Sequence, residues 1–134
     1  MGIFVDQTVN FLQKALDAAS LRQNVLANNI ANVNTPGFKR SYVSFEESLQ
    51  QALKKKKKME ITANQPGHLK EERLENVKPQ IKTDNSTSLR EDGNNVDIDT
   101  EMTQLAMNSI NYQTAITRLN GKLSTLRLVI NGGR

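Results

Sequence analysis

The 134-residue sequence contains no cysteine, no tryptophan and only one histidine, His68. Without cysteine the chain can form neither a disulfide nor a thiolate metal site, and a single histidine excludes a multi-histidine metal site. A serine–histidine–aspartate triad would have to use His68, which follows Pro66-Gly67 and is predicted to be a loop residue. Aromatic residues make up 4% of the chain, which excludes a large aromatic-rich core.

Long apolar runs and catalytic motifs are missing as well. No stretch approaches the roughly 20 apolar residues that a membrane-spanning helix needs. The first six residues lack the basic region and small-residue cleavage site of a secretory signal, so no cleaved signal peptide is expected. There is no glycine-rich phosphate loop, nucleophile elbow or spaced carboxylate–histidine cluster. The sequence therefore predicts no catalytic residue, no cofactor and no metal ligand, and a protein that is not an enzyme.

Charge is concentrated in the middle of the chain. Residues 36–95 carry twelve basic and nine acidic residues, 21 of the 32 charges in the sequence. Apolar residues follow the opposite trend, with 18 in residues 1–35, 16 in residues 96–134 and only 15 in the 60 residues between. This contrast predicts three parts: an N-terminal axial helix over 1–35, a polar middle segment over 36–95 and a C-terminal axial helix over 96–134.

Apolar residues in both end segments recur at alternating intervals of four and three. This spacing is typical of long helices that pack at a shallow angle, as in coiled coils. In the first segment the repeat positions are Val5, Val9, Leu12, Leu16, Ala19, Gln23, Leu26, Ile30 and Val33. In the last segment they are Ile98, Met102, Leu105, Ser109, Tyr112, Ile116, Leu119, Leu123, Leu126 and Ile130. The predicted fold is therefore mainly α, with long antiparallel N- and C-terminal helices.

Residues at the expected helix ends support this interpretation. Asn34-Thr35-Pro36-Gly37 is expected to end the first helix, because proline disfavours helix in the residue before it and glycine often follows a helix. Asp99 is the predicted N-cap of the last helix, and Glu101 is expected to face the positive end of its dipole. Gly132-Gly133 is expected to end that helix.

A lone helical hairpin buries only one side of each helix, so these helices are expected to need neighbours from the same chain or from others. The first helix also carries an amide stripe on the face opposite its apolar repeat, formed by Asn24, Asn28 and Asn32. Two interpretations fit this stripe. It is either a solvated face near the turn, or a second packing surface that bonds adjacent subunits without burying charge.

The polar middle segment carries weaker patterns. Ser44 and Glu47 match a capping box, which predicts a short third helix near residues 45–57. Short strands are predicted near 59–63 and 77–83.

This segment also contains two predicted turns and a run of five lysines. Gln65-Pro66-Gly67 and Asp92-Gly93-Asn94-Asn95 both predict turns. The five lysines Lys54–Lys58 are typical of a solvated helix C-terminus, where the dipole favours cations. Nucleic-acid binding is the alternative for this run, but no aromatic residues interleave with it.

Two segments resemble a known protein family. Residues 21–40, with the sequence LRQNVLANNIANVNTPGFKR, resemble the N-terminal signature of the bacterial flagellar rod and hook axial proteins. Residues 92–102, with the sequence DGNNVDIDTEM, are similar to the proximal rod subunit type of that family, as are Leu105-Ala106 and Ile110–Gln113. The large inserted domain of hook and distal-rod types has no room in this chain.

The resemblance implies a structural subunit that assembles helically through its terminal helices into the periplasmic rod and transmits torque. It implies passage through the flagellar type III export apparatus without a cleaved signal. The implied partners are copies of the same chain, other flagellar rod subunits and the membrane-ring/rod junction protein (FliE), and neither nucleic acid nor a small-molecule substrate is expected. The alternatives are another short rod or hook-type subunit and a coiled-coil adaptor protein.

The expected subunit interface combines the apolar repeats with the turn after the first helix, where Asn28, Asn32, Thr35 and Gly37 are expected to set the turn and the lateral contacts. The predicted interface residues are Val5, Val9, Leu12, Leu16, Leu26, Asn28, Ile30, Asn32, Thr35, Gly37, Met102, Leu105, Tyr112, Ile116, Leu119, Leu123, Leu126 and Ile130.

Overall fold

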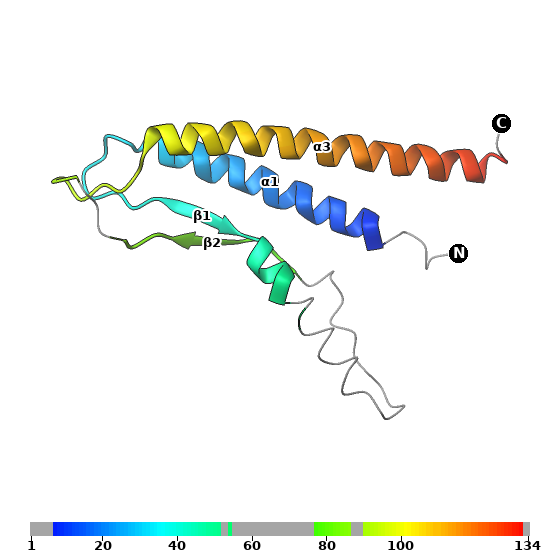
Figure 1. Ribbon diagram of the computed structural model, residues 1–134, viewed down its shortest axis with the longest axis horizontal. Coiled ribbons are helices and arrows are strands. Elements are labelled where there is room, and N and C mark those ends of the chain that lie inside the picture. The colour runs from blue at the N-terminus through cyan, green and yellow to red at the C-terminus, as the bar shows by residue number, and fades with distance from the viewer. Residues whose placement is uncertain (1–6, 52–53, 55–76, 87–89, 133–134) are drawn as a thin grey trace, which may run out of the picture.

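Two long helices dominate the computed structural model, which describes residues 7–51, 54, 77–86 and 90–132. Helix α1 spans Gln7–Ala31 and helix α3 spans Ile98–Ile130. The two helices lie side by side and run antiparallel, and α3 continues past the start of α1 (Figure 1). The predicted mainly α fold with long antiparallel terminal helices is confirmed. No helix in the described part of the chain is both long and apolar enough to cross a membrane.

A two-stranded antiparallel sheet lies along the helix pair on the α1 side (Figure 1). Strand β1 is Ser41–Ser44 and strand β2 is Gln80–Thr83, paired with Ser41 opposite Thr83 and Ser44 opposite Gln80. Strand β2 lies within the strand predicted near 77–83. No sequence pattern predicts β1, because four residues are too few to show alternation and the partner strand lies far along the chain.

The apolar core lies between α1 and the sheet. It consists of Ala18 and Val25 from α1 with Val43, Phe45 and Val77 from the sheet side. Helix α1 is also buried on a second face, at Leu12, Ala19 and Leu26, which follow one another at intervals of seven as the predicted repeat requires. Helix α1 therefore packs on both the sheet and α3.

Helix α3 packs on α1 differently from the prediction. Its buried residues within the described chain are Glu101 and Asn108, each one position before a residue of the predicted apolar repeat. The repeat residues Ile98 and Met102 are 45% and 51% exposed. The buried face of α3 is displaced from its apolar repeat, because the side chains of Glu101 and Asn108 bond to groups of α1 at 2.8 Å in both cases.

The start of α3 also corrects the prediction, because Asp97 rather than Asp99 is the N-cap. The Asp97 carboxylate accepts hydrogen bonds from the Thr100 hydroxyl at 2.6 Å and from the backbone N–H of Asp99 at 3.1 Å. Two aspartates offer the same capping chemistry, and the extended backbone of Asp97 decides between them. At the other end Asn131 is the C-cap, followed by Gly132 in the left-handed region at φ 70°, so the predicted stop is confirmed.

The short third helix is confirmed over residues 46–51. The Ser44 hydroxyl donates to Glu47 Oε2 at 2.9 Å, so the predicted pair is present. The carbonyl of Phe45 accepts the first helical bond, from Leu49 N–H at 2.9 Å, which places the N-cap at Phe45 and Ser44 one residue before it.

Several predictions fall outside the described residues. These are Val5, the strand near 59–63, the turn at Gln65-Pro66-Gly67, the loop position of His68 and the role of lysines 55–58. The division into three parts at residues 35 and 95 stays a prediction.

Candidate functional site

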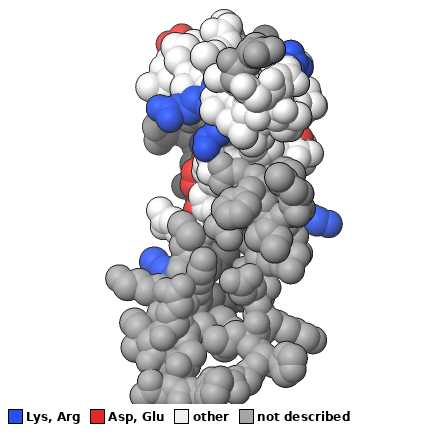
Figure 2. All heavy atoms as spheres, turned by 90° about the vertical axis from the view of Figure 1, so that its right-hand side faces the viewer, with Lys and Arg blue, Asp and Glu red and all other residues white. Residues whose placement is uncertain are grey.

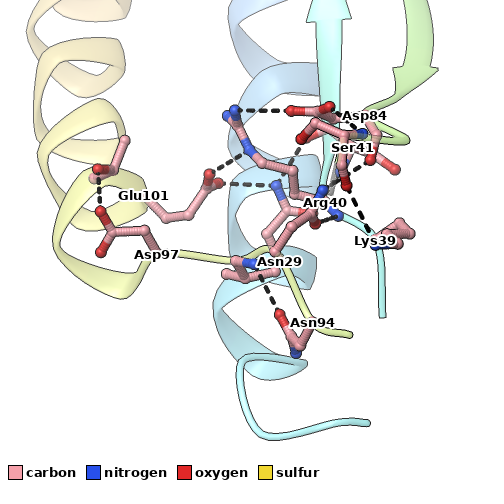
Figure 3. A network of polar contacts seen from close by, with 12 residues as sticks. Asn29, Lys39, Arg40, Ser41, Asp84, Asn94, Asp97 and Glu101 are labelled. Atoms are coloured by element: carbon pink, nitrogen blue, oxygen red, sulfur yellow. Dashed lines mark hydrogen bonds and ion pairs between the residues drawn. The ribbon is translucent and has the colours of Figure 1, made fainter. Parts of the chain in front are cut away.

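Polar side chains gather at the end of the helix pair where α1 stops and α3 starts, which we call the interlocked end (Figure 3). Asn29 comes from α1, Arg40 immediately precedes β1 and Ser41 begins it. Asn94 comes from the loop before α3, and Glu101 from the first turn of α3. All but Ser41 belong to the two segments that resemble the flagellar family. The two segments, remote in sequence, therefore meet in space.

The side chain of Asn29 pairs with β1 as a neighbouring strand would. Its Nδ2 donates to the carbonyl of Ser41 at 2.7 Å, and its Oδ1 accepts from the N–H of Ser41 at 3.0 Å. Asn29 has no exposed surface, so neither bond can be replaced by water. One amide thus covers the outer edge of β1 at Ser41 and fixes the strand against α1.

Glu101 has no exposed surface either, and its carboxylate joins three segments. Its Oε2 accepts from Asn29 Nδ2 at 2.8 Å, and its Oε1 accepts from Arg40 Nε at 3.0 Å. The same guanidinium lies 3.7 Å from Asp84 Oδ2, measured at Nη1, just beyond β2. A buried carboxylate is tolerated only when it is paired and hydrogen-bonded, so Asn29 and Arg40 are both needed to hold Glu101 inside.

Asn94 closes the end of α1. Its Nδ2 lies 2.9 Å from the carbonyl oxygens of Asn32 and Thr35 and 3.0 Å from that of Val33. Its Oδ1 accepts from the N–H of Val96 at 2.7 Å. Where a helix ends, backbone carbonyls lose their partners within the helix. Here the side chain of Asn94, from the segment before α3, supplies a donor to three carbonyls in the turn that follows α1.

Two glycine turns lie against each other at this end. Gly37 and Gly93 have φ of 71° and 76°, a left-handed conformation that residues with a side chain rarely adopt. The N–H of Gly37 donates to the carbonyl of Asp92 at 2.7 Å, and a Cβ at Gly93 would lie 3.8 Å from Gly37 Cα. The turn here spans residues 90–93, closed by the Gly93 N–H donating to the carbonyl of Arg90 at 3.1 Å, so it begins two residues before the predicted turn at 92–95. It packs on the turn that ends α1.

Asn95 ties these turns to the sheet. Its Oδ1 accepts from the N–H of Arg40 at 2.7 Å, and its Nδ2 donates to the carbonyl of Asp84 at 2.8 Å. The two bonds reach the residues that immediately precede β1 and follow β2. We call the paired strands β1 and β2 the β-hairpin, although residues 45–79 separate them in the sequence. Side chains therefore anchor the β-hairpin to the interlocked end.

Ion pairs along the β-hairpin side are more exposed. Arg22 donates to Glu46 at 2.7 Å, and Lys82 donates to Glu47 at 2.8 Å. Partial burial opposes ionisation of Glu46, but the hydrogen bond and charge of Arg22 together with backbone hydrogen bonds outweigh it and lower the pKa of this carboxyl below its ordinary value. Bonding to Lys82 and to Ser44 lowers the pKa of Glu47 in the same direction.

A cleft of about 340 Å³ lies near the interlocked end, and its lining residues are Arg22, Arg40, Tyr42, Val43 and Gln104. Both of its arginines are already paired with carboxylates, Arg22 with Glu46 and Arg40 with Glu101. The cleft therefore offers little net positive charge to an anion. Among the described residues, no three histidine, aspartate or glutamate side chains lie close enough to hold a metal ion.

The opposite end of the helix pair is apolar, and we call residues 119–130 of α3 the free end. Leu128, Val129 and Ile130 are 56%, 71% and 82% exposed there. Figure 2 looks onto this side of the molecule, and the described surface in it is mostly uncharged, with a few Lys, Arg, Asp and Glu residues. In the described chain, no residue of α3 beyond Asn108 is buried.

The predicted interface residues are distributed over both ends. Leu12 and Leu26 are buried. The half-buried ones are Val9, Leu16, Ile30, Asn32, Leu105, Tyr112, Ile116, Leu119 and Leu126. The exposed ones are Asn28, Thr35, Gly37, Met102, Leu123 and Ile130. The structure brings Asn32 and Thr35 together, with the Thr35 hydroxyl donating to Asn32 Oδ1 at 3.1 Å.

Sequence reasoning missed the roles of Asn29, Arg40, Asn94 and Glu101. A usable signal was present for two of them. Asn29 lies beside the apolar repeat yet is a poor helix former, and Glu101 is one residue before a repeat position on a helix with few charges. Polar residues next to a predicted packing face are candidates for buried hydrogen bonds.

Comparisons with known proteins agree with the family resemblance of residues 21–40 and 92–102. Residues 10–39 match the family model described as flagella basal body rod protein. The chain is 39% identical over 127 residues to the flagellar basal body rod protein FlgB of Bacillus subtilis, covering 95% of each chain. It is 38% identical to FlgB of Borreliella burgdorferi over 112 residues, covering 80% of this chain and 83% of that one. It is 32% identical to FlgB of Escherichia coli over 135 residues, covering 96% of each. Since this similarity extends over nearly the whole chain, the protein belongs to the FlgB family of flagellar basal body rod proteins, structural subunits of the bacterial flagellum.

Proposed function

We propose that this rod protein assembles helically with copies of itself and with other rod subunits, through α1 and α3. The observation that carries the proposal is the packing of α3, a 33-residue helix whose buried residues in the described chain are both polar. Many of its large apolar side chains are exposed, including Met107 and Ile110 as well as Leu128, Val129 and Ile130 at the free end. Monomeric proteins rarely expose a large apolar surface unless it binds a partner.

The free energy of association would come from covering the apolar side chains that α3 leaves in water. Burying a leucine, isoleucine or valine side chain contributes about 1.5–3 kcal/mol, and α3 leaves several such side chains in water. A neighbouring helix would cover them without burying charge, because residues 119–130 carry only Lys122 and Arg127 as charged residues. The proposed interface is the set of predicted interface residues named in the sequence analysis, of which Leu12 and Leu26 are already buried within the subunit, and the free end is its largest exposed part.

The proposed place of this subunit is the proximal rod, in the periplasm, where the rod transmits torque by packing alone. The proposed route is the flagellar type III export apparatus, without a cleaved signal. The membrane-ring/rod junction protein (FliE) is the proposed partner at the base of the rod. Support for these points comes from family membership and from the signature residues 21–40 and 92–102.

The test is to replace Leu119 and Leu123 by Asp in the full chain. Two charges on this face would have to be desolvated on assembly, so we expect loss of motility and of rod assembly with normal expression. A control with Asn120→Asp and Ser124→Asp adds the same charge at exposed polar positions of the same turns and is expected to remain motile. Motile cells carrying the leucine substitutions would contradict the proposal.

A further inference from the structure

We propose that α3 carries a second packing face, on its side away from α1, and that this face binds α1 of an adjacent copy of the chain. The proposal rests on the assembly proposed above and specifies which helices meet in it. It concerns the assembled subunit and does not require an ordered structure in the free chain. Its consequence is that each copy contacts two neighbours through two different surfaces.

The second face of α3, which we call the outer face, has the spacing of a packed helix and shares no residue with the apolar repeat described above. Glu101 and Asn108 bond to α1. Thr103 and Ile110 follow them by two positions, about 200° further round the helix, so the outer face lies opposite α1. Figure 1 shows no described element on that side of α3. The residues of the outer face recur at intervals of three and four and are all exposed: Thr103, Met107, Ile110, Thr114, Thr117, Gly121, Thr125 and Leu128.

No residue of the outer face is charged. The solvent face of an amphipathic helix normally carries charged residues, so exposure to water alone does not account for this composition. The three large apolar side chains Met107, Ile110 and Leu128 are 61%, 64% and 56% exposed on it. A neighbouring helix could therefore cover this face without desolvating a charge.

The threonine hydroxyls of the outer face are already hydrogen-bonded inside α3. Threonine forms helices less readily than alanine, glutamate or lysine, so four threonines on one face are not explained by helix stability. Because their donors are satisfied within the helix, covering this face leaves no threonine hydroxyl donor unpaired. Each hydroxyl donates to the carbonyl four residues earlier: Thr103 to Asp99 at 2.8 Å, Thr114 to Ile110 at 2.9 Å, Thr117 to Gln113 at 2.9 Å and Thr125 to Gly121 at 3.0 Å.

Gly121 lies on the outer face in the interior of α3. Glycine is a poor helix former, and a Cβ at this position would project into open space. Nothing in the described part of the subunit therefore requires glycine here. The backbone of a neighbouring helix can come closest where a side chain is missing, so Gly121 marks the point of closest approach.

Helix α1 offers the complementary surface. One side of it, at Ala18 and Val25, is buried in the core, and a second is buried at Leu12, Ala19 and Leu26. A third side is exposed and has the same spacing of three and four. Most of its side chains are small or carry an amide, which leaves room for the larger side chains of the outer face, as knobs into holes. The residues of this third side are Gln13, Asp17, Ser20, Asn24, Ala27 and Ala31.

A contact between unlike faces can be repeated from copy to copy. If the outer face of α3 bound the outer face of another α3, the two copies would close as a two-fold dimer and the third side of α1 would stay exposed. Binding of α3 to α1 of the next copy leaves one such face free at each end, so further copies add in the same way. A contact of this kind generates a ring or a helical filament. It also continues the α1–α3 packing present inside the subunit.

The absence of cysteine allows this contact to be tested by cross-linking in assembled rods. Cells that carry full-length double variants are treated with a short bis-maleimide, and the products are separated by size. Positions seven residues apart lie about 10 Å apart along a helix, so a set of six double variants samples a range of axial offsets between copies. Each combines Thr103→Cys or Thr117→Cys of α3 with Gln13→Cys, Ser20→Cys or Ala27→Cys of α1.

We expect at least one double variant to give a ladder of dimers, trimers and larger products, because each copy then has two reactive neighbours. A single-cysteine variant is expected to give nothing larger than a dimer, since one cysteine joins only two chains. The matched control uses Asn120→Cys in place of Thr117→Cys, with the same cysteines in α1. Asn120 is exposed and lies 100° round the helix from Gly121, so no ladder is expected.

Gly121→Leu is an independent test of the same contact. Leucine is a better helix former than glycine, so the substitution favours the helix but fills the point of closest approach. We expect Gly121→Leu to abolish rod assembly and motility. Asn120→Leu, the same new side chain one position earlier, is the control and is expected to remain motile.

Motile cells in which none of the six double variants gives a ladder would overturn the proposal and leave helical assembly itself intact. Cross-linking to a different rod subunit in place of the ladder would overturn the choice of a second copy. If the cysteine variants do not assemble, Gly121→Leu decides, and motility equal to that of Asn120→Leu overturns the proposal. The test at Leu119 and Leu123 concerns the other repeat of α3, so the two proposals fail separately.

Discussion

The two ends of the helix pair differ in the residues they contain and in the interactions these residues make. At the interlocked end, buried amides and one buried carboxylate hold α1, α3 and the β-hairpin together through directed hydrogen bonds. At the free end, apolar side chains of α3 lie largely in water. Directed polar bonds select one internal geometry, because a buried polar group without its partner is costly. Exposed apolar surface selects no geometry by itself but leaves free energy for association.

This difference indicates how one short chain can have a defined internal geometry and also an apolar surface available for association. The interlocked end defines the internal geometry of the subunit. The free end then supplies surface that gains by being covered. Changes at the interlocked end are therefore expected to alter the folding of the single chain, and changes at the free end to alter assembly.

The largest expected effect is at Asn29. Replacing Asn29 by Ala removes both bonds to Ser41 and one of the two partners of Glu101, so we expect the free energy of unfolding to fall by about 3 kcal/mol. Urea unfolding of the monomer followed by circular dichroism measures it. Asn28→Ala, an exposed neighbour, is the control and is expected to change stability by less than about 0.5 kcal/mol. Equal effects of the two substitutions on the free energy of unfolding would mean that the buried hydrogen bonds of Asn29 do not stabilise the interlocked end.

A smaller effect of opposite sign is expected at Asn108. Its Nδ2 donates to the carbonyl of Ala19 at 2.8 Å, whereas its Oδ1 is buried without a hydrogen-bond partner. Replacing it by Leu removes that unpaired acceptor from the helix interface, so we expect a gain of about 1 kcal/mol in the free energy of unfolding. Asn111→Leu, at an exposed position of α3, is the control. A clear loss of stability in Asn108→Leu would show that the bond to Ala19 outweighs the unpaired oxygen.

The smallest expected effect is that of acid. Hydrogen bonding by Thr100 lowers the pKa of Asp97 below its ordinary value of 3.8, and bonding by Lys82 lowers the pKa of Glu47 below its ordinary value of 4.5. A lowered folded-state pKa means that the stabilisation is fully present above the ordinary value and is lost as the pH falls through the lowered value. Both groups are exposed, so the effect is small.

Acid is therefore expected to act on the start of α3 and on the β-hairpin before the free end, whose described residues include no acidic side chain. Hydrogen exchange of the monomer at a series of pH values between about 5 and 2 measures the order of events. Exchange at residues 119–130 that rises with acid earlier than exchange at 97–101 would contradict this assignment.

Prediction from the sequence succeeded where the pattern is local. The repeat in residues 1–35 identifies the buried positions Leu12, Ala19 and Leu26, because helical periodicity depends only on the helix itself. It failed at Asp97, where Asp99 offers the same chemistry two residues later. It failed also at β1, because four residues are too few to show alternation and the partner strand β2 lies far along the chain.

The apolar repeat of α3 shows the limit most clearly. Spacing alone places Met102 and Ser109 on the helix interface, whereas the structure buries their neighbours Glu101 and Asn108. A pattern of apolar residues indicates which face gains by being covered, but not which neighbour covers it. In this chain α1 pairs with the polar positions, and the apolar ones are left exposed or half-buried.

Local sequence was thus enough to specify two long helices, the stop of α3 at Gly132, a turn close to the predicted one at residues 92–95, and the membership of the chain in a flagellar family. The choice of which α3 face meets α1, and the joining of Asn29, Arg40 and Glu101 into one buried network, required the folded chain. The reason is physical: helix periodicity and turn geometry arise from neighbours along the backbone, whereas a buried hydrogen bond exists only once segments remote in sequence have excluded water together.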